Sequence, residues 1–189
     1  MRQILFFSSF LLMANLLAQN KKTTADSTTK VVYTDIVKVD STNRFELYQK
    51  ASKWIGSQSF TLVEENILEG KIMAKNSFDV FSEKGVLSKP NGVFTHDVSI
   101  DVKDGKYRYT FSNFLYRKYK QDRQDLLKYI PERSTKAIED NKAPGWSKQW
   151  SKNKMQATDK INQYIISLRD AMKYVARKTA APPKPKEEW

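Results

Sequence analysis

The chain has 189 residues, with 33 Lys and Arg against 21 Asp and Glu, one His and no Cys. This length suits one domain with appendages, and a composition that is 40% hydrophobic and 12% aromatic excludes a disordered chain. The absence of Cys excludes disulfide frameworks, thiolate nucleophiles, zinc ribbons and iron–sulfur clusters, and a single His excludes sites that need two imidazoles. The net charge of +12 raises the question of an anionic partner.

The N-terminus has the pattern of a secretory signal peptide. Arg2 supplies a short positive region, residues 4–17 are mostly apolar, and the small residue Ala18 precedes the expected cleavage site. A membrane anchor is the alternative, but an apolar run of about 14 residues falls short of the ~20 that a spanning helix needs. The sequence therefore predicts a signal peptide over residues 1–18, export to the periplasm or beyond the cell, and no transmembrane segment after cleavage.

The next residues predict a spacer, a strand and a helix. Residues 19–30 are almost entirely polar and are typical of a flexible spacer. Residues 31–39 are rich in β-branched side chains, which favours a strand. Asn43 and the polar residues before it can cap a helix over residues 44–56, whose apolar residues recur at helical spacing.

Two hairpins follow in the predicted sheet. Residues 61–69 and 71–81 flank Gly70, and residues 84–92 predict a loop. Residues 93–103 and 106–114 alternate around Asp104-Gly105, the strongest short-range hairpin signal. A two-residue loop fixes the register, with these expected pairs: Lys103–Lys106, Val102–Tyr107, Asp101–Arg108, Ile100–Tyr109, Ser99–Thr110 and Val98–Phe111.

The register places the single histidine on the core side of the sheet. His96 shares its parity with Val98 and Ile100, and it is predicted to face Asn113. A general base or a lone ligand is one interpretation. The other is a partly buried His that Asn113 or a backbone group satisfies, and it is favoured because nothing in the sequence supplies a nucleophile beside His96.

The C-terminal half predicts a basic connector and a long helix. Residues 117–130 suggest a short helix that ends at Pro131, within a basic connector over residues 117–151. Residues 152–178 predict a helix whose apolar stripe covers the sheet, and the Pro-rich tail 179–189 is expected to be disordered. The stripe consists of Ile161, Ile165, Leu168, Met172 and Val175, widened by Met155, Tyr164 and Ala171.

This order of elements predicts an α+β fold: strand, helix, four antiparallel strands and a long C-terminal helix, in two layers with one open sheet face. The segments FELYQKASKWIG, EGKI and VSIDVKDGKYRYTFSNF, with the strand before them, resemble domain-of-unknown-function family 4468. That resemblance covers about residues 31–116 and implies an exported bacterial protein with a TBP-like sandwich. It implies no activity and no functional residues, because the family has none assigned, and a fold name does not carry function.

Two surfaces are candidate binding sites. The open sheet face carries Ser99, Asp101, Arg108 and Thr110, and its alternative is an ordinary solvated face. Residues 117–189 hold 18 basic and 9 acidic residues, so the excess charge lies there. The possible anion-binding patch consists of Arg117, Lys118, Lys120, Arg123, Lys148, Lys152 and Lys154, and its alternative is a solvated helix face.

The sequence predicts an exported, non-enzymatic binding or envelope-associated module with no cofactor and no metal site. Its partner is expected to be an envelope protein or an anionic surface, and nucleic acid is not expected, because the chain is predicted to be exported. One alternative is a peripheral binder of anionic membrane or polymer that uses the basic C-terminal half. The other is a hydrolase with carboxylate or Ser–Lys chemistry, although no GxSxG, HExxH or P-loop motif occurs.

Overall fold

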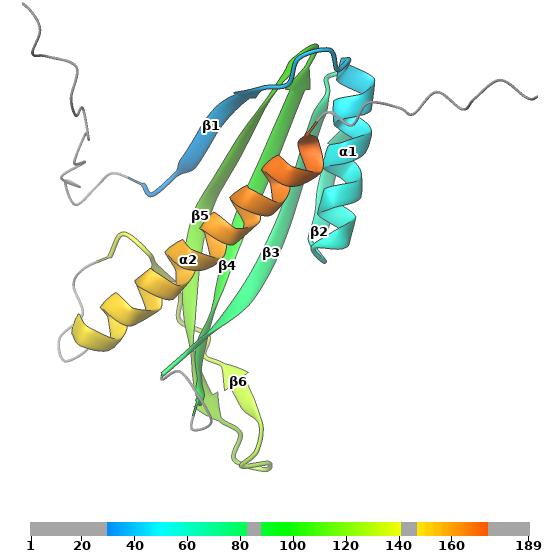
Figure 1. Cartoon of the computed structure of the whole chain (residues 1–189). Coiled ribbons are helices and arrows are strands. Elements are labelled where there is room, and N and C mark those ends of the chain that lie inside the picture. Colours follow the sequence, from blue (N-terminus) through cyan, green and yellow to red (C-terminus); the bar gives the residue numbers. More distant parts are fainter. Residues whose placement is uncertain (1–29, 83–87, 141–146, 174–189) are drawn as a thin grey trace, which may run out of the picture.

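The computed structural model describes residues 30–82, 88–140 and 147–173. The predicted signal peptide, nearly all of the spacer and the Pro-rich tail lie outside these residues. Figure 1 shows two layers, in which both helices cover the same face of an antiparallel sheet. In chain order the elements are β1 (Tyr33–Lys38), α1 (Arg44–Ser57), β2 (Thr61–Asn66), β3 (Lys71–Phe81), β4 (Pro90–Lys103), β5 (Lys106–Gln121), β6 (Tyr129–Pro131), β7 (Lys136–Ala137) and α2 (Ser147–Met172).

The sheet has the strand order β1-β5-β4-β3-β2. The hairpin around Asp104-Gly105 has the predicted register, from Lys103 opposite Lys106 to Val98 opposite Phe111. Strands β1, β7 and β6 pair in turn along the other edge of β5, so β5 is the longest and most widely paired strand. The predicted α+β architecture with a long C-terminal helix is therefore confirmed.

A β-bulge interrupts the pairing of β4 with β5. Asp97 of β4 still pairs with Ser112 of β5. The next β4 residue, His96, stands opposite two residues, Asn113 and Phe114, because the register shifts there. Asn113 has a φ of 55°, a left-handed conformation that Asn tolerates better than most residues. The predicted pairing of His96 with Asn113 alone was wrong for this reason.

The bulge changes which residues of β5 face the helices. Before it, odd-numbered residues are buried, and after it, even-numbered residues are buried, because one extra residue reverses the alternation. The apolar residues of β5 follow the same change of parity. Those buried before the bulge are Tyr107, Tyr109 and Phe111, and those buried after it are Phe114 and Tyr116.

Helix α1 forms as the sequence predicts. The Asn43 side chain accepts a hydrogen bond of 2.8 Å from the backbone N–H of Glu46, which is the expected N-cap. Trp54 is buried under α2, where its indole N–H donates to Ser167 Oγ at 3.1 Å. The indole also packs against Phe60 with a centroid distance of 5.2 Å. These contacts join the two helices to each other and to the sheet.

Helix α2 begins earlier than predicted, at Ser147 rather than at residue 152, and its described part ends at Met172. Two predicted members of its apolar stripe, Met155 and Ala171, are exposed instead. Val175 lies outside the described residues. The buried face consists of Trp150, Asn153, Ala157, Ile161, Tyr164, Leu168 and Met172.

The predicted helix that ends at Pro131 was wrong. Strand β5 continues to Gln121 and turns back into β6, which pairs with residues 119–121. Local spacing of apolar residues suggested a helix, but pairing with neighbouring strands decides the structure of such short segments. The predicted connector therefore contains the end of β5, β6, β7 and the start of α2, and the predicted loop 84–92 contains the start of β4 at Pro90.

His96 lies in the middle of the core, with 1% of its surface exposed. Neither ring nitrogen has a hydrogen-bond partner among the described residues. The expectation that Asn113 satisfies it was wrong, because the Asn113 amide donates to the Asp97 carboxylate at 2.6 Å. The imidazole is instead surrounded by aromatic rings at centroid distances of 5.6 to 5.9 Å: Phe60, Phe78, Phe111, Phe114 and Tyr164.

We predict that Gly92→Ala destabilises the fold by about 2 kcal/mol or more, because a β carbon there overpacks a tight contact. It would lie 2.4 Å from the Tyr116 ring and 2.5 Å from the backbone oxygen of Arg117. Urea unfolding measures the change. Gly56→Ala is the matched control, since no atom lies within 4 Å of its added carbon. The control is expected to be neutral or to stabilise α1 by less than about 1 kcal/mol, and equal losses in both variants would contradict the argument.

The burial of His96 predicts a pH-dependent stability. Burial lowers the pKa of His96 from 6.5 to about 4, with the Asp97 charge opposing the shift. The unfolded chain therefore binds a proton on His96 that the folded chain excludes, so stability falls as the pH drops from 6.5 towards 4. His96→Leu is expected to be at least as stable at pH 7, because it removes two unpaired buried nitrogens.

Unfolding of wild type and His96→Leu across this pH range isolates the contribution of the imidazole. The wild type is expected to lose up to about 3 kcal/mol relative to the variant by pH 4. The carboxylates cancel in the comparison, since both proteins carry them. Parallel pH profiles would show that the folded protein accommodates the imidazolium.

Candidate functional site

A groove of about 570 Å³ lies between the edge strand β1 and the C-terminal part of α2. One wall is the run of residues 35–39, which contains the second half of β1. Arg169 of α2 and Lys173, which follows the helix, line the other side, and Tyr107 of β5 completes the lining. The groove therefore lies along an exposed strand edge with cationic side chains facing it.

An ion pair bridges the two sides of this groove. Arg169 Nη2 donates to Asp35 Oδ2 at 2.7 Å and to the Tyr109 hydroxyl at 3.2 Å. The Arg169 and Asp35 side chains are 47% and 50% exposed, so solvent screens the pair and it contributes little stability. The hydrogen bond with Tyr109, followed by the nearby negative charge of Asp35, raises the pKa of Arg169 and keeps it charged.

Within the described part of the chain, no strand pairs with the outer edge of β1, whose residues border the groove. Val39 N–H donates to Gly105 O at 2.8 Å, towards β5. Because backbone groups alternate in direction along a strand, those of Thr34, Ile36 and Lys38 point away from β5. The Ile36 N–H is capped by its neighbour, since it donates to Asp35 Oδ1 at 2.8 Å. The Asp35 carboxylate therefore binds both the strand edge and Arg169.

Tyr107 supplies a polar group without a partner. Tyr107 is 1% exposed, and its hydroxyl has no hydrogen-bond partner among the described residues. Burial raises the pKa of Tyr107 to about 12, and the positive charge of Arg169 partly opposes this shift. The hydroxyl stays neutral at physiological pH and retains a donor next to the groove.

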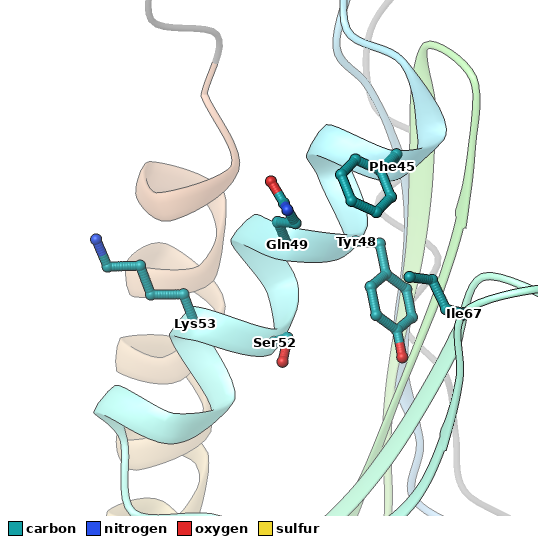
Figure 2. Close-up of a pocket in the computed structure, with 6 residues that line it drawn as sticks. All are labelled: Phe45, Tyr48, Gln49, Ser52, Lys53 and Ile67. Atoms are coloured by element: carbon teal, nitrogen blue, oxygen red, sulfur yellow. The ribbon is translucent and has the colours of Figure 1, made fainter.

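A second groove of about 460 Å³ lies beside α1. Figure 2 shows the ring of Tyr48 beside Ile67 of the β2–β3 turn, whereas Lys53 points to the other side of the helix. Phe45 is 56% exposed and Ile67 is 46% exposed. Burial and then the neighbouring Glu65 carboxylate raise the pKa of Tyr48 to about 12. Its lining comes from α1 and the β2–β3 turn, and no strand residue belongs to it.

The four candidates on the open sheet face lie together, on the face without helices. The Arg108 guanidinium donates to Asp101 Oδ2 from Nη2 at 3.0 Å and from Nε at 3.2 Å. Ser99 stands opposite Thr110, whose hydroxyl lies 3.1 Å from that of Thr34. The predicted positions on this face are confirmed. Asp101 and Arg108, the two charged residues among the four candidates, form an ion pair with each other.

The seven basic candidates are divided between two parts of the fold. Arg117, Lys118 and Lys120 lie in β5 and Arg123 in the turn after it. The other three, Lys148, Lys152 and Lys154, lie in the first half of α2. Lys154 Nζ is 5.8 Å from the centre of the Trp150 ring. His96, the remaining candidate, belongs to the core rather than to a site.

Sequence reasoning missed the groove beside β1. Its residues Asp35 and Arg169 are 134 positions apart, so no local pattern connects them. The one available signal was an acidic residue inside an otherwise β-branched strand. Within the described ranges there is no group of three or more His, Asp or Glu side chains that could hold a metal ion. In the same residues, no helix has the length and apolar character needed to cross a bilayer.

Comparisons with known proteins agree with this architecture. A crystal structure of a DUF4468 family protein from Bacteroides ovatus has a TM-score of 0.59 and 10% identity, covering 82% of this chain and 91% of that one. A TBP-like protein from Parabacteroides distasonis has a TM-score of 0.52 and 14% identity, covering 75% of this chain and 94% of that one. No curated protein matches.

At these identities the two crystal structures establish the fold alone. A family model, the domain of unknown function DUF4468 with TBP-like fold, matches residues 33–117, which run from β1 to the second half of β5. This match confirms the resemblance that the helix and hairpin motifs indicated. Residues 33–117 of this chain are therefore a DUF4468 domain with a TBP-like fold, which the long helix α2 covers.

Proposed function

We propose that this chain is an exported, non-enzymatic binding module that takes an extended, carboxylate-bearing segment of a partner protein into the groove between β1 and α2. The observation that carries the proposal is the coincidence of a free strand edge and an Arg169 side chain on the two sides of one groove. Export rests on the signal-peptide pattern of residues 1–18.

Strand addition is the binding mode that this groove favours. An exposed edge offers unpaired N–H and C=O groups, and an extended peptide satisfies them by adding a strand to the sheet. The outward-pointing groups of Thr34, Ile36 and Lys38 are such an edge. Ile36 is also 61% exposed, so its side chain is available for contact on the open face of the sheet.

The charges at the groove favour a carboxylate on the incoming segment. Both hydrogen bonds of Arg169 to described residues use Nη2, so Nη1 and Nε remain as donors for a second carboxylate. Lys38 lies on the strand and Lys173 directly after the end of α2, and both line the groove. Arg169 and Lys173 therefore face Asp35 across the space that a ligand would occupy, and Lys173 is also paired with Asp170.

We predict that Arg169→Gln weakens binding of an acidic extended peptide by about tenfold or more, because a charge-assisted contact is lost. The probe is a labelled peptide of about eight residues that alternates Val and Thr with Asp at two positions, the length of a long strand. Fluorescence polarisation measures its affinity. A peptide with Lys in place of Asp is expected to bind more weakly.

Arg108→Gln is the matched control, since Arg108 also pairs with an aspartate on a β-strand but lies on the open face. This variant is expected to bind the peptide as the wild type does. Amide hydrogen exchange gives a second readout, in which the N–H groups of Thr34 and Lys38 become protected only when the peptide is bound. Equal effects of the two arginine variants, or protection elsewhere alone, would refute the groove as the site.

A further inference from the structure

The β5–β6 hairpin projects from the end of the sheet farthest from α1, beyond the part that the helices cover (Figure 1). Residues 119–121 pair with residues 129–131, and residues 122–128 form the tip. Tyr119 ties the base of the hairpin to the sheet, since its hydroxyl donates to Asp79 Oδ1 of β3 at 2.7 Å. The hairpin is therefore a supported extension of the central strand.

Hydrogen bonds within the tip hold it in one conformation. The Asp122 N–H donates to Lys128 O and the Lys128 N–H donates to Asp125 O, both at 2.9 Å. The two acidic side chains are directed to the backbone of the tip. Asp122 Oδ1 accepts from the Gln124 N–H at 2.9 Å, and Asp125 Oδ1 accepts from the Leu127 N–H at 3.0 Å. Both carboxylates therefore serve to fold the turn.

This ordered tip exposes two adjacent leucines. Leu126 is 67% exposed and Leu127 is 92% exposed, the highest value for a large apolar side chain in the described residues. A folded turn has no conformational reason to place Leu at both positions, since turns favour Gly, Pro, Asn, Asp and Ser. Adjacent exposed apolar side chains at a protruding position indicate a contact surface.

Basic side chains surround the leucines in sequence and along the hairpin. Arg123 and Lys128 belong to the tip, Lys120 lies at the end of β5, and Arg133 follows β6; all four are exposed. Asp122, Asp125 and Glu132 lie in the same stretch, so residues 120–133 hold four basic and three acidic side chains, a net charge of +1. The tip thus combines two exposed leucines with four exposed basic side chains.

We propose that the β5–β6 hairpin is a membrane-contact element, which inserts Leu126 and Leu127 among the lipids of an anionic bilayer while the surrounding cations bind lipid phosphates. A bilayer fits better than a protein partner. Two leucines at a narrow tip bury far less than the roughly 800 Å² per partner of a stable protein interface. An interfacial contact, in contrast, needs a few apolar groups and adjacent Lys and Arg side chains.

Vesicle sedimentation tests the proposal on residues 19–189, which retain every described residue and remove the apolar leader. The probe is phosphatidylcholine vesicles with about 30% phosphatidylglycerol, compared with phosphatidylcholine alone. The wild type is expected to bind only the anionic vesicles, and less strongly in about 0.5 M salt. The double variant Leu126→Ser, Leu127→Ser is expected to lose about tenfold or more in affinity.

The β2–β3 turn offers a matched control. Ile67 and Leu68 are also adjacent, lie in a turn between two strands, and are 46% and 80% exposed. The double variant Ile67→Ser, Leu68→Ser is expected to bind vesicles as the wild type does. Absence of wild-type binding, or equal loss in both double variants, would overturn the proposal.

Insertion is separated from simple charge attraction by Leu127→Trp. On anionic vesicles that contain brominated lipid, this variant is expected to show fluorescence quenching well above that of the wild type, whose own four Trp set the background. Salt-sensitive binding without this additional quenching would mean that only the cations meet the surface, and it would overturn the insertion of the leucines.

Discussion

The arrangement of this fold depends on one extra residue in its central strand. Strand β5 spans 16 residues. Such a strand keeps its apolar side chains on one face only while apolar and polar residues alternate, and where this alternation fails an extra residue must restore it. Asn113 provides the correction, with a φ of 55° and a side chain that bonds Asp97 across the bulge. Phe114 and Tyr116 then face the helix side, as Tyr107 and Phe111 do on the other side of the bulge.

The bulge determines where α2 can lie. Tyr116, together with Phe94, packs against Trp150 near the start of the helix, at centroid distances of 5.3 and 6.0 Å. Tyr109, before the bulge, contacts Arg169 near the end of the helix. One helix thus crosses both halves of β5 diagonally (Figure 1), which places its cationic end beside β1 and leaves the β5–β6 hairpin uncovered. The two proposed contact surfaces are therefore at different ends of the same strand.

The sequence predicted the local features of this fold well. The Asn43 cap, the helix after it and the register around Asp104-Gly105 all depend on neighbouring residues, which is why they could be predicted. The bulge had only a partial signal, since Phe114 and Tyr116 are even-numbered after the odd-numbered Tyr107, Tyr109 and Phe111, but Leu115 and Tyr119 are odd. Because the predicted strand ended at Phe114, the rest of β5 was interpreted from the spacing of its apolar residues, which resembles that of a helix.

The binding surfaces could not be predicted in the same way. The open face was found because alternation alone defines it, but the groove beside β1 requires Asp35 and Arg169 to meet across 134 positions. That contact depends on the path of α2, and the path depends on the bulge. Leu126 and Leu127 were assigned to a helix, where neighbouring apolar residues are ordinary, so their exposure could be recognised only once the hairpin was known.

Asp35 protects the outer edge of β1, and it also takes part in the proposed recognition of a partner strand at that edge. Its carboxylate accepts from the Ile36 N–H and from Arg169, so the free edge already carries one bound carboxylate of its own. A neutral strand that displaced Asp35 would leave Arg169 without its partner, at a net loss of charge-assisted hydrogen bonds. In the proposed binding mode, a strand with its own carboxylate instead binds Nη1 and Nε of Arg169, which its bonds to Asp35 and Tyr109 leave as donors. In the proposed complex, the donors that remain on Arg169 therefore favour an incoming segment that carries a carboxylate.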